Sequence, residues 1–152
     1  MGWAVGGEAL SEAQTWKTLK QLIAPLDPYR VENLVDAGCP DVNYTGGWIE
    51  LKNVPKWPKR PNTLVRIDHY TDQQRLWLLR RWKAGGRAFL VVQVDRSWFL
   101  FGAHSAQLVG YITREQMIAS CLCWWQGKPV AEQLITWLTV RWETLEHLDT
   151  TP

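Results

Sequence analysis

The chain has 152 residues, a length that predicts one domain with its own hydrophobic core. Hydrophobic residues make up 46% and charged residues 21%, which excludes an intrinsically disordered chain. No run approaches the ~20 apolar residues of a membrane span, and the N-terminus lacks the basic start and apolar run of a signal peptide. With three cysteines, an odd number, we expect a cytoplasmic protein with reduced thiols.

The net charge of +2 is too small to indicate a nucleic-acid partner, but the basic residues are unevenly distributed. Residues 52–66 contain no acid and five basic residues, namely Lys52, Lys56, Lys59, Arg60 and Arg66. Local charge sets the field that a polyanion meets, so this stretch is a candidate binding surface. The chain also has eleven tryptophans, most of which we expect in the core or in an interface.

Capping patterns and hydrophobic periodicity predict the first elements. A capping box at Ser11–Gln14 begins a helix that Pro25 stops. A short strand is predicted at 29–33. Strands at 41–44 and 48–52 then flank a Thr-Gly-Gly turn, which is typical of a β-hairpin.

The later elements follow from the same signals. In chain order they are a proline-rich loop at 53–62, a strand at 64–67, a capped helix from Thr71 through Trp82, a strand pair at 88–94 and 97–101, a capped helix from Thr113 to about Trp125, and a helix with Pro129 at its first position that runs to about Glu146. This order predicts an α/β fold with a small mixed β-sheet core flanked by helices. The residues from about 113 to 146 form a C-terminal extension of two helices.

The most informative stretch is the hairpin that carries Asp41, Glu50 and Lys52. Side chains alternate along a strand, so Glu50 and Lys52 share one face while Leu51 points to the other. If a two-residue turn at Thr45–Gly46 closes the hairpin, Asp41 faces Glu50 with Cβ atoms about 5 Å apart. A turn one residue longer would break this pairing unless a bulge restored it.

Two carboxylates at that distance repel each other, which favours a shared proton or a bound cation. Oxygen ligands with room for water suit Mg²⁺ or Mn²⁺, and these ions usually serve phosphate chemistry. Lys52 could position or deprotonate an attacking water, or stabilise charge on a phosphoryl group. The alternative is a solvated surface hairpin with ordinary ion pairs, and the spacing alone favours that alternative.

The motif Pro40-Asp41-x8-Glu50-x-Lys52 resembles the signature of the PD-(D/E)XK nuclease superfamily, with 48–52 as its apolar strand. The segments 30–33 and 38–42 look like those of small phage-encoded nucleases, which are similar to archaeal-type Holliday junction resolvases and phage endonuclease I. The likeness covers about residues 10–103. It implies a single restriction-endonuclease-like nuclease domain over residues 1–152.

The resemblance also implies roles for individual residues. Asp41, Glu50 and the Leu51 carbonyl would hold the metal, and Lys52 would orient the attacking water. Glu12 would be the helix acid that contacts the metal directly or through water. The alternative for Glu12 is a first-turn residue that stabilises the helix dipole.

Three further residues near the motif have competing interpretations. Gln74 sits where several relatives place an active-site glutamine, but Thr71-x-x-Gln74 is also a capping box. Glu32 competes with Glu12 as the extra acid, although an ion pair with the nearby Arg30 suits it better. His69 would contact phosphate or stack on its neighbour.

The loop Lys56-Trp57-Pro58-Lys59-Arg60 interleaves cations with an indole, a pattern that suits a phosphate backbone beside an unstacked base. The alternative is an ordinary basic loop with Trp57 in the core. No base-reading motif is present, so recognition of DNA shape or backbone is expected. The expected DNA-contacting residues are Arg30, Lys56, Trp57, Lys59, Arg60, Arg66 and His69.

The carboxylate pair and the resemblance together predict a Mg²⁺-dependent endodeoxyribonuclease, with Mn²⁺ able to substitute, and the resemblance implies branched DNA such as Holliday junctions as its substrate. A homodimer is implied mainly by the resemblance, because a two-fold protein can cut two opposed strands symmetrically. If the protein is phage-encoded, its place is the host cytoplasm. The alternatives are a repair nickase or DNA end-processing nuclease of the same chemistry, and a catalytically inactive module that binds DNA shape. The intact set of Asp41, Glu50 and Lys52 argues against the inactive module.

Overall fold

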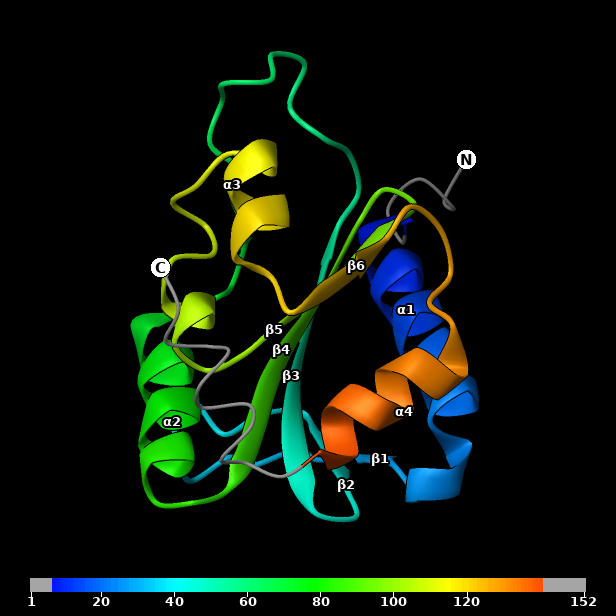
Figure 1. Cartoon of the computed structure of the whole chain (residues 1–152). Helices are drawn as coiled ribbons and strands as arrows, with labels where there is room; N and C mark the ends of the chain where they lie inside the picture. The colour runs from blue at the N-terminus through cyan, green and yellow to red at the C-terminus, as the bar shows by residue number, and fades with distance from the viewer. Residues whose placement is uncertain (1–6, 141–152) are drawn as a thin grey trace.

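A computed structural model describes residues 7–140, with side chains from residue 12 onward. The elements are α1 (Gly7–Leu22), η2 (Ala24–Leu26), β1 (Tyr29–Arg30), β2 (Val42–Tyr44), β3 (Gly47–Val54), α2 (Asp72–Lys83), β4 (Arg87–Val94), β5 (Ser97–Phe101), η3 (Ser105–Gln107), α3 (Arg114–Ser120), β6 (Cys123–Trp125) and α4 (Ala131–Thr139). Figure 1 shows them around one twisted sheet.

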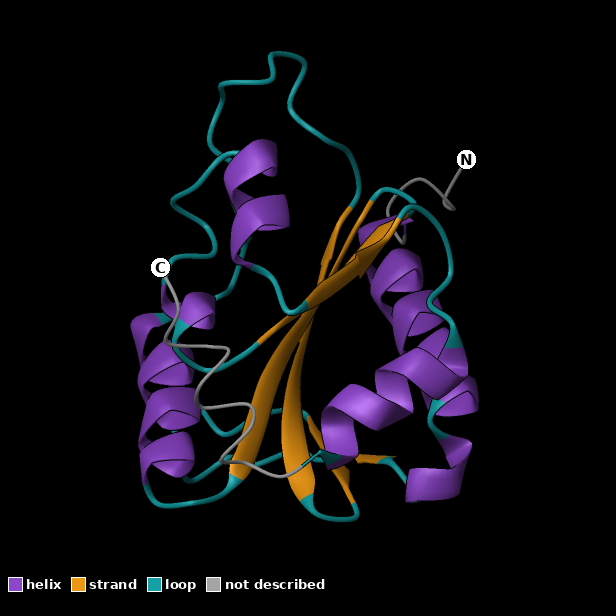
Figure 2. Cartoon of the chain, viewed as in Figure 1, coloured by secondary structure: helices purple, strands orange, loops and turns teal. Residues whose placement is uncertain are grey.

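The six strands lie in the sheet in their chain order, from β1 to β6. Only β3 and β4 are parallel, and α2 is the crossover helix that a parallel pair requires. All other neighbouring strands are antiparallel. Helices α2 and α3 lie on one side of the sheet, and α1 and α4 lie on the other (Figure 2). The predicted α/β fold, a small mixed sheet flanked by helices, is confirmed.

The local signals that predicted the second half of this core are present in the structure. Thr71 and Thr113 each accept a hydrogen bond from the backbone N–H three residues on, and the side-chain oxygen of the glutamine there accepts one from the threonine N–H, so both capping boxes form. The strands predicted at 88–94 and 97–101 are β4 and β5. Because helices cover both faces, every residue of β5 is buried.

Two predicted boundaries near the N-terminus are wrong. Helix α1 begins at Gly7, so Ser11 lies inside it and is not its N-cap. The reason is that the intervening residues include Ala9 and Leu10, which are strong helix formers. The strand predicted at 29–33 is only the two-residue β1, because the chain then leaves the sheet in a loop.

Three later predictions also need correction. The segment 64–67 forms no strand, although Val65 N–H donates to the Ile112 carbonyl in a single backbone contact. Helix α3 ends at Ser120, and the Cys-Trp-Trp stretch after it pairs with β5 as the edge strand β6. Short apolar runs rich in aromatic residues suit a strand as well as a helix, and pairing with β5 makes this run a strand. Helix α4 begins at Ala131, so Pro129 precedes it, and its predicted end near residue 146 lies outside the described residues.

The aromatic side chains fill both layers around the sheet. All nine tryptophans between residues 7 and 140 are buried or partly buried, as expected from their number. The three cysteines form no disulfide. Within the described part of the chain, no helix is both long and apolar enough to span a membrane.

Candidate active site

The β2–β3 hairpin has the register on which the candidate site depends. Tyr44 pairs with Gly47 and Val42 with Ile49, so the turn contains only Thr45 and Gly46. Gly47 is required here, because a Cβ at this position would lie 2.4 Å from the Tyr44 hydroxyl. Extending the same register by one position places Asp41 opposite Glu50, as predicted for a two-residue turn.

The hydrogen-bond ladder between β2 and β3 ends at Pro40. Beyond that point the backbone N–H of Leu51 donates to the Asp41 side chain instead of to β2 backbone. Hydrogen-bonded pairs recur at every second position, so Pro40 would be the next partner of Leu51. Proline has no N–H and cannot donate to the Leu51 carbonyl. The Leu51 N–H instead donates to Asp41 Oδ1 at 3.0 Å. The Leu51 carbonyl therefore points toward the same side as the Asp41 carboxylate.

Glu50 is a buried carboxylate with one oxygen left unsatisfied. The residue is 2% exposed, and its Oε1 lies 3.4 Å from Lys52 Nζ. Its Oε2 has no hydrogen-bond partner among the described residues. Buried polar atoms are almost always hydrogen-bonded in folded proteins, so this oxygen calls for a proton, an ordered water or a bound cation.

Burial and mutual repulsion shape the proton affinity of the pair. Burial, followed by the nearby Asp41 carboxylate, raises the pKa of Glu50 to about 8, with Lys52 opposing the shift. Burial also raises the pKa of Asp41 above its usual value, while Arg30 and the Leu51 N–H oppose the rise. Arg30 Nη2 lies 3.5 Å from Asp41 Oδ2. Two neighbouring carboxyls with raised pKa values therefore share a proton at neutral pH.

Lys52 is held in place from two sides. Its Nζ donates to the His69 carbonyl at 2.8 Å and lies beside Glu50. His69 has a φ of 62°, in the left-handed region that a residue other than glycine rarely adopts. Such backbone strain clusters at functional sites, and here it turns the carbonyl toward the lysine. Tyr70 follows, with its ring centroid 5.9 Å from Nζ.

Arg75 packs against Tyr70, the residue after His69, a role that sequence reasoning missed. Its guanidinium lies 4.0 Å from the Tyr70 ring centroid and 4.8 Å from that of Tyr111. It also donates to the carbonyls of Tyr70 and Val109. No sequence signal separates this buried arginine from the exposed ones of the same helix.

The loop before Asp41 is packed directly on the start of α2. Gly38 has a φ of 84°, and a Cβ there would lie 2.4 Å from the Gln73 carbonyl oxygen. Only glycine permits this approach of two backbones. The contact between Gly38 and Gln73 fixes the chain just before Asp41 against the first turn of α2.

We expect Gly38→Ala to destabilise the protein by about 2 kcal/mol or more and to displace Asp41, because both strain and a backbone clash result. Gly85→Ala is a matched control, since Gly85 has a φ of 96° but no atom within 4 Å of the added Cβ. Chemical denaturation of both variants measures the difference. Equal losses in the two variants would contradict the packing role of Gly38.

The structure does not bring the other predicted acids to the pair. Glu12 is exposed on α1, and Thr15 of the same helix accepts a hydrogen bond from Asn53, on the face of β3 opposite Glu50. Within residues 7–140, no three His, Cys, Asp or Glu side chains are grouped closely enough to hold a metal ion. Glu32 is exposed, and Arg30, its expected partner, pairs with Asp41.

The remaining candidates divide between capping and surface positions. Gln74 Oε1 accepts from the Thr71 N–H at 2.9 Å, so this side chain serves the capping box. The His69 side chain is exposed, as are those of Lys56, Lys59, Arg60 and Arg66. The Trp57 ring packs edge-on against Phe99 with 5.7 Å between centroids, as the alternative interpretation of that loop predicted.

Comparison with known proteins adds no assignment to this geometry. No protein-family model matches the chain, and no curated protein matches its sequence. The inference about function therefore depends on the site itself.

Proposed function

We propose that the protein is a metal-dependent endonuclease that hydrolyses DNA phosphodiester bonds, with branched DNA such as Holliday junctions as its preferred substrate. The observation that carries the proposal is the buried Glu50, whose Oε2 lacks a partner among the described residues and which faces a second carboxylate. A hairpin that served only the fold would gain stability by replacing such a pair with apolar residues.

The oxygen atoms present fit a divalent cation. Asp41, Glu50 and the Leu51 carbonyl would hold it, and water and substrate oxygens would complete its shell. Hard oxygen ligands with few protein contacts suit Mg²⁺, and Mn²⁺ would substitute. When bound, the cation would lower the pKa of a coordinated water and neutralise charge on the phosphate. Glu12 lies on the other side of the sheet core, so it is not part of this ligand set.

Lys52 is the residue that would orient the attacking water. An ammonium group has three N–H donors, and the His69 carbonyl and Glu50 occupy two of them. The third is available to orient a water for in-line attack at phosphorus or to contact a developing negative charge. Because Lys52 and Glu50 lie two residues apart on one strand, their spacing is fixed by the sheet.

The proposal is tested by incubating the protein with a labelled four-way junction and with a linear duplex of matched sequence. Each is treated with Mg²⁺, with EDTA, and with the Asp41→Asn variant as control. We expect paired Mg²⁺-dependent nicks near the branch point that are absent from the linear duplex and from the variant. The paired pattern also reports on the expected homodimer.

Other outcomes separate the competing functions. Equal cutting of both substrates would keep the nuclease and replace the junction resolvase by a nickase or an end-processing enzyme. Tight junction binding without cutting would indicate an inactive module that binds DNA shape. Full activity of Asp41→Asn would refute the carboxylate site altogether.

A further inference from the structure

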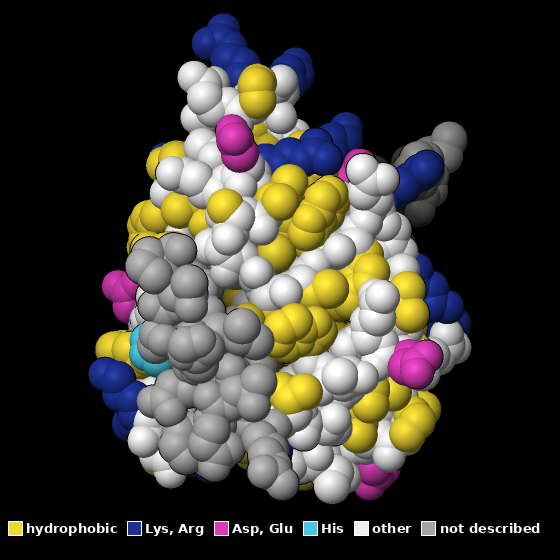
Figure 3. Space-filling model, viewed as in Figure 1, with side chains coloured by type: hydrophobic (Ala, Val, Ile, Leu, Met, Phe, Trp, Pro, Cys, Tyr) yellow, Lys and Arg dark blue, Asp and Glu magenta, His cyan; other side chains and the backbone are white. Residues whose placement is uncertain are grey.

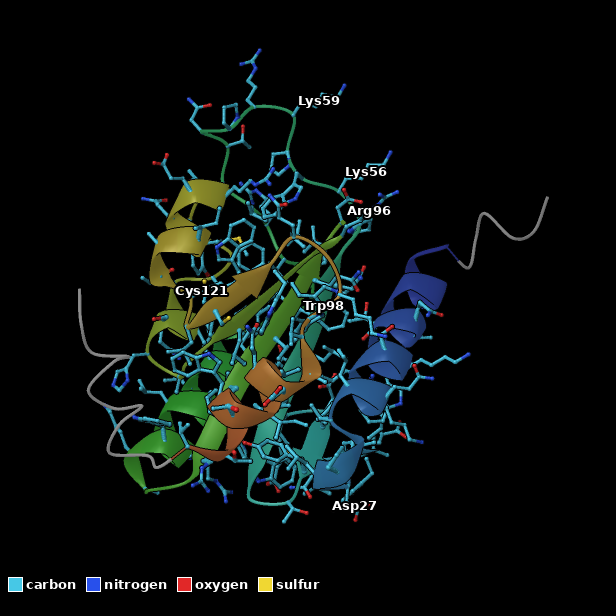
Figure 4. All side chains as sticks on the ribbon, turned by 45° about the vertical axis from the view of Figure 1, so that its right-hand side comes forward. Asp27, Lys56, Lys59, Arg96, Trp98 and Cys121 are labelled. Carbon is cyan, nitrogen blue, oxygen red and sulfur yellow. The ribbon has the colours of Figure 1, made fainter. Side chains whose placement is uncertain are left out.

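The loop that follows β3 forms a basic pocket with the first turn of α3. The pocket has a volume of about 150 Å³ and is lined by Trp57, Lys59, Arg60, Thr63, Arg114 and two prolines, with no acidic residue among them. Lys and Arg side chains gather at this end of the molecule (Figure 3), where Lys56, Lys59 and Arg96 project together (Figure 4). A cluster of one sign in a concave surface attracts anions.

Trp57 forms part of the pocket's structure and orients one of its cations. One side of the indole packs against Phe99, and the Arg114 guanidinium lies 4.5 Å from its ring centroid. The ring is therefore engaged by Phe99 through an edge contact and by the guanidinium over its face. A guanidinium held by an aromatic face presents its planar fork of donors with little loss of entropy, which suits phosphate oxygens.

The pocket lies on the same face of the sheet as the candidate active site. Lys52 is paired with Val92, and Val92 with Phe99, so all three side chains share one face. Glu50 lies on that face as well, because it is two residues from Lys52. The Phe99 ring that supports Trp57 and the carboxylate pair are thus on one side of the molecule, the side that α2 and α3 cover (Figure 2).

One chain segment leads from the pocket to the active site. Thr63 lines the pocket, and His69 holds Lys52 through its carbonyl. They are six positions apart in the chain, so their Cα atoms are at most about 20 Å apart even in a fully extended chain. Arg66 lies midway along the segment with its side chain exposed. An exposed arginine therefore lies on the segment between the pocket and the active site.

We propose that this pocket binds a phosphate of the DNA backbone within about six nucleotides of the cleaved bond, since successive phosphates of one strand are about 3.4 Å apart along the axis. Arg66 contacts the backbone between the two points. The inference rests on the proposed function for its reference point, the cleaved bond. It extends the DNA surface to Arg114, in the C-terminal extension, and assigns recognition to backbone charge.

The first test measures DNA binding in EDTA, where no cleavage occurs. We expect Lys59→Gln with Arg60→Gln, and Arg60→Gln with Arg114→Gln, each to weaken binding about tenfold or more and to reduce the salt slope by about 1. The control removes two exposed charges from α1 on the opposite face, Lys17→Gln with Lys20→Gln, and should change binding far less. Lys59 and Arg60 are exposed, so the first variant keeps the test valid if loss of Arg114 disturbs α3.

The second test neutralises the phosphates of one strand beside the cleaved bond. Methylphosphonates at the first six positions remove the charge that the pocket would hold. Wild-type affinity should then fall toward that of the pocket variants, and the variants should respond less to the substitution. Pocket variants that bind and cleave like the α1 control would overturn the inference and leave the nuclease intact. Pocket-dependent binding without Mg²⁺-dependent cleavage would refute the nuclease and keep the pocket only as a binding site for backbone phosphate.

Discussion

Glu50→Gln is expected to reduce Mg²⁺-dependent cleavage by a factor of 10³ or more and, at the same time, to stabilise the metal-free protein at pH 8. The first effect follows because a neutral amide replaces one of the two carboxylates that would hold the cation. The second follows because the wild-type carboxylate is 2% exposed and has an orphaned oxygen. A substitution that improves stability while it removes activity is typical of a functional site.

The sign of the stability effect follows from the direction of the pKa shift. The pKa of Glu50 is about 8 in the folded protein and 4.5 in the unfolded chain, so the folded state binds the proton more tightly. Its contribution to stability is therefore complete below pH 4.5 and is lost as the pH rises toward 8. Over that range the loss is roughly 4 kcal/mol, at 1.36 kcal/mol per unit of pKa. Glutamine cannot ionise and escapes this loss.

Urea denaturation at pH 5 and pH 8 in EDTA measures the effect. We expect wild type and Glu50→Gln to differ little at pH 5 and by several kcal/mol at pH 8. Glu132→Gln is the control, because this carboxylate on α4 is exposed and should show no such difference. A variant less stable than wild type at pH 8 would show that Glu50 is a structural residue and would remove the main support for the nuclease.

The sequence predicted those parts of the site that local signals determine. The Thr45-Gly46-Gly47 stretch indicated the hairpin but left the length of its turn open, and the two-residue turn that forms places Asp41 opposite Glu50 by strand periodicity. The capping box at Thr71 correctly placed the start of α2. Both features depend on residues that are near each other in the chain, which is why a single sequence contains enough information.

The missed features depend on contacts between distant segments. Nothing near Arg75 in the sequence indicates that Tyr70 and Tyr111 enclose its guanidinium. Likewise, Arg114 is the first residue of α3, and only the fold places it over Trp57, more than fifty positions earlier. Whether Glu12 can join the carboxylate pair depends on the face of the sheet on which α1 packs. The sequence predicts an acid on that helix, but it does not predict the face.

Binding of a divalent cation is expected to strengthen about tenfold for each pH unit up to about pH 8 and then to level off. The reason is that Asp41 and Glu50 share a proton below that pH, and this proton must leave when the cation binds. Calorimetric titration with Mn²⁺ in two buffers of different ionisation enthalpy should show release of about one proton at pH 7. The cleavage rate at limiting metal should follow the same pH dependence.

The charge of Arg30 provides a way to move this transition in a known direction. Its guanidinium lowers the pKa of Asp41, so Arg30→Gln should shift the midpoint of metal binding upward. Lys17→Gln removes an exposed charge that pairs with neither carboxylate and should leave the midpoint unchanged. A downward shift, or metal affinity that does not vary between pH 6 and 8, would mean that the carboxylate pair does not hold the cation. An upward shift confined to Arg30→Gln would locate the titrating proton on the Asp41–Glu50 pair, where the cation and the attacking water would meet.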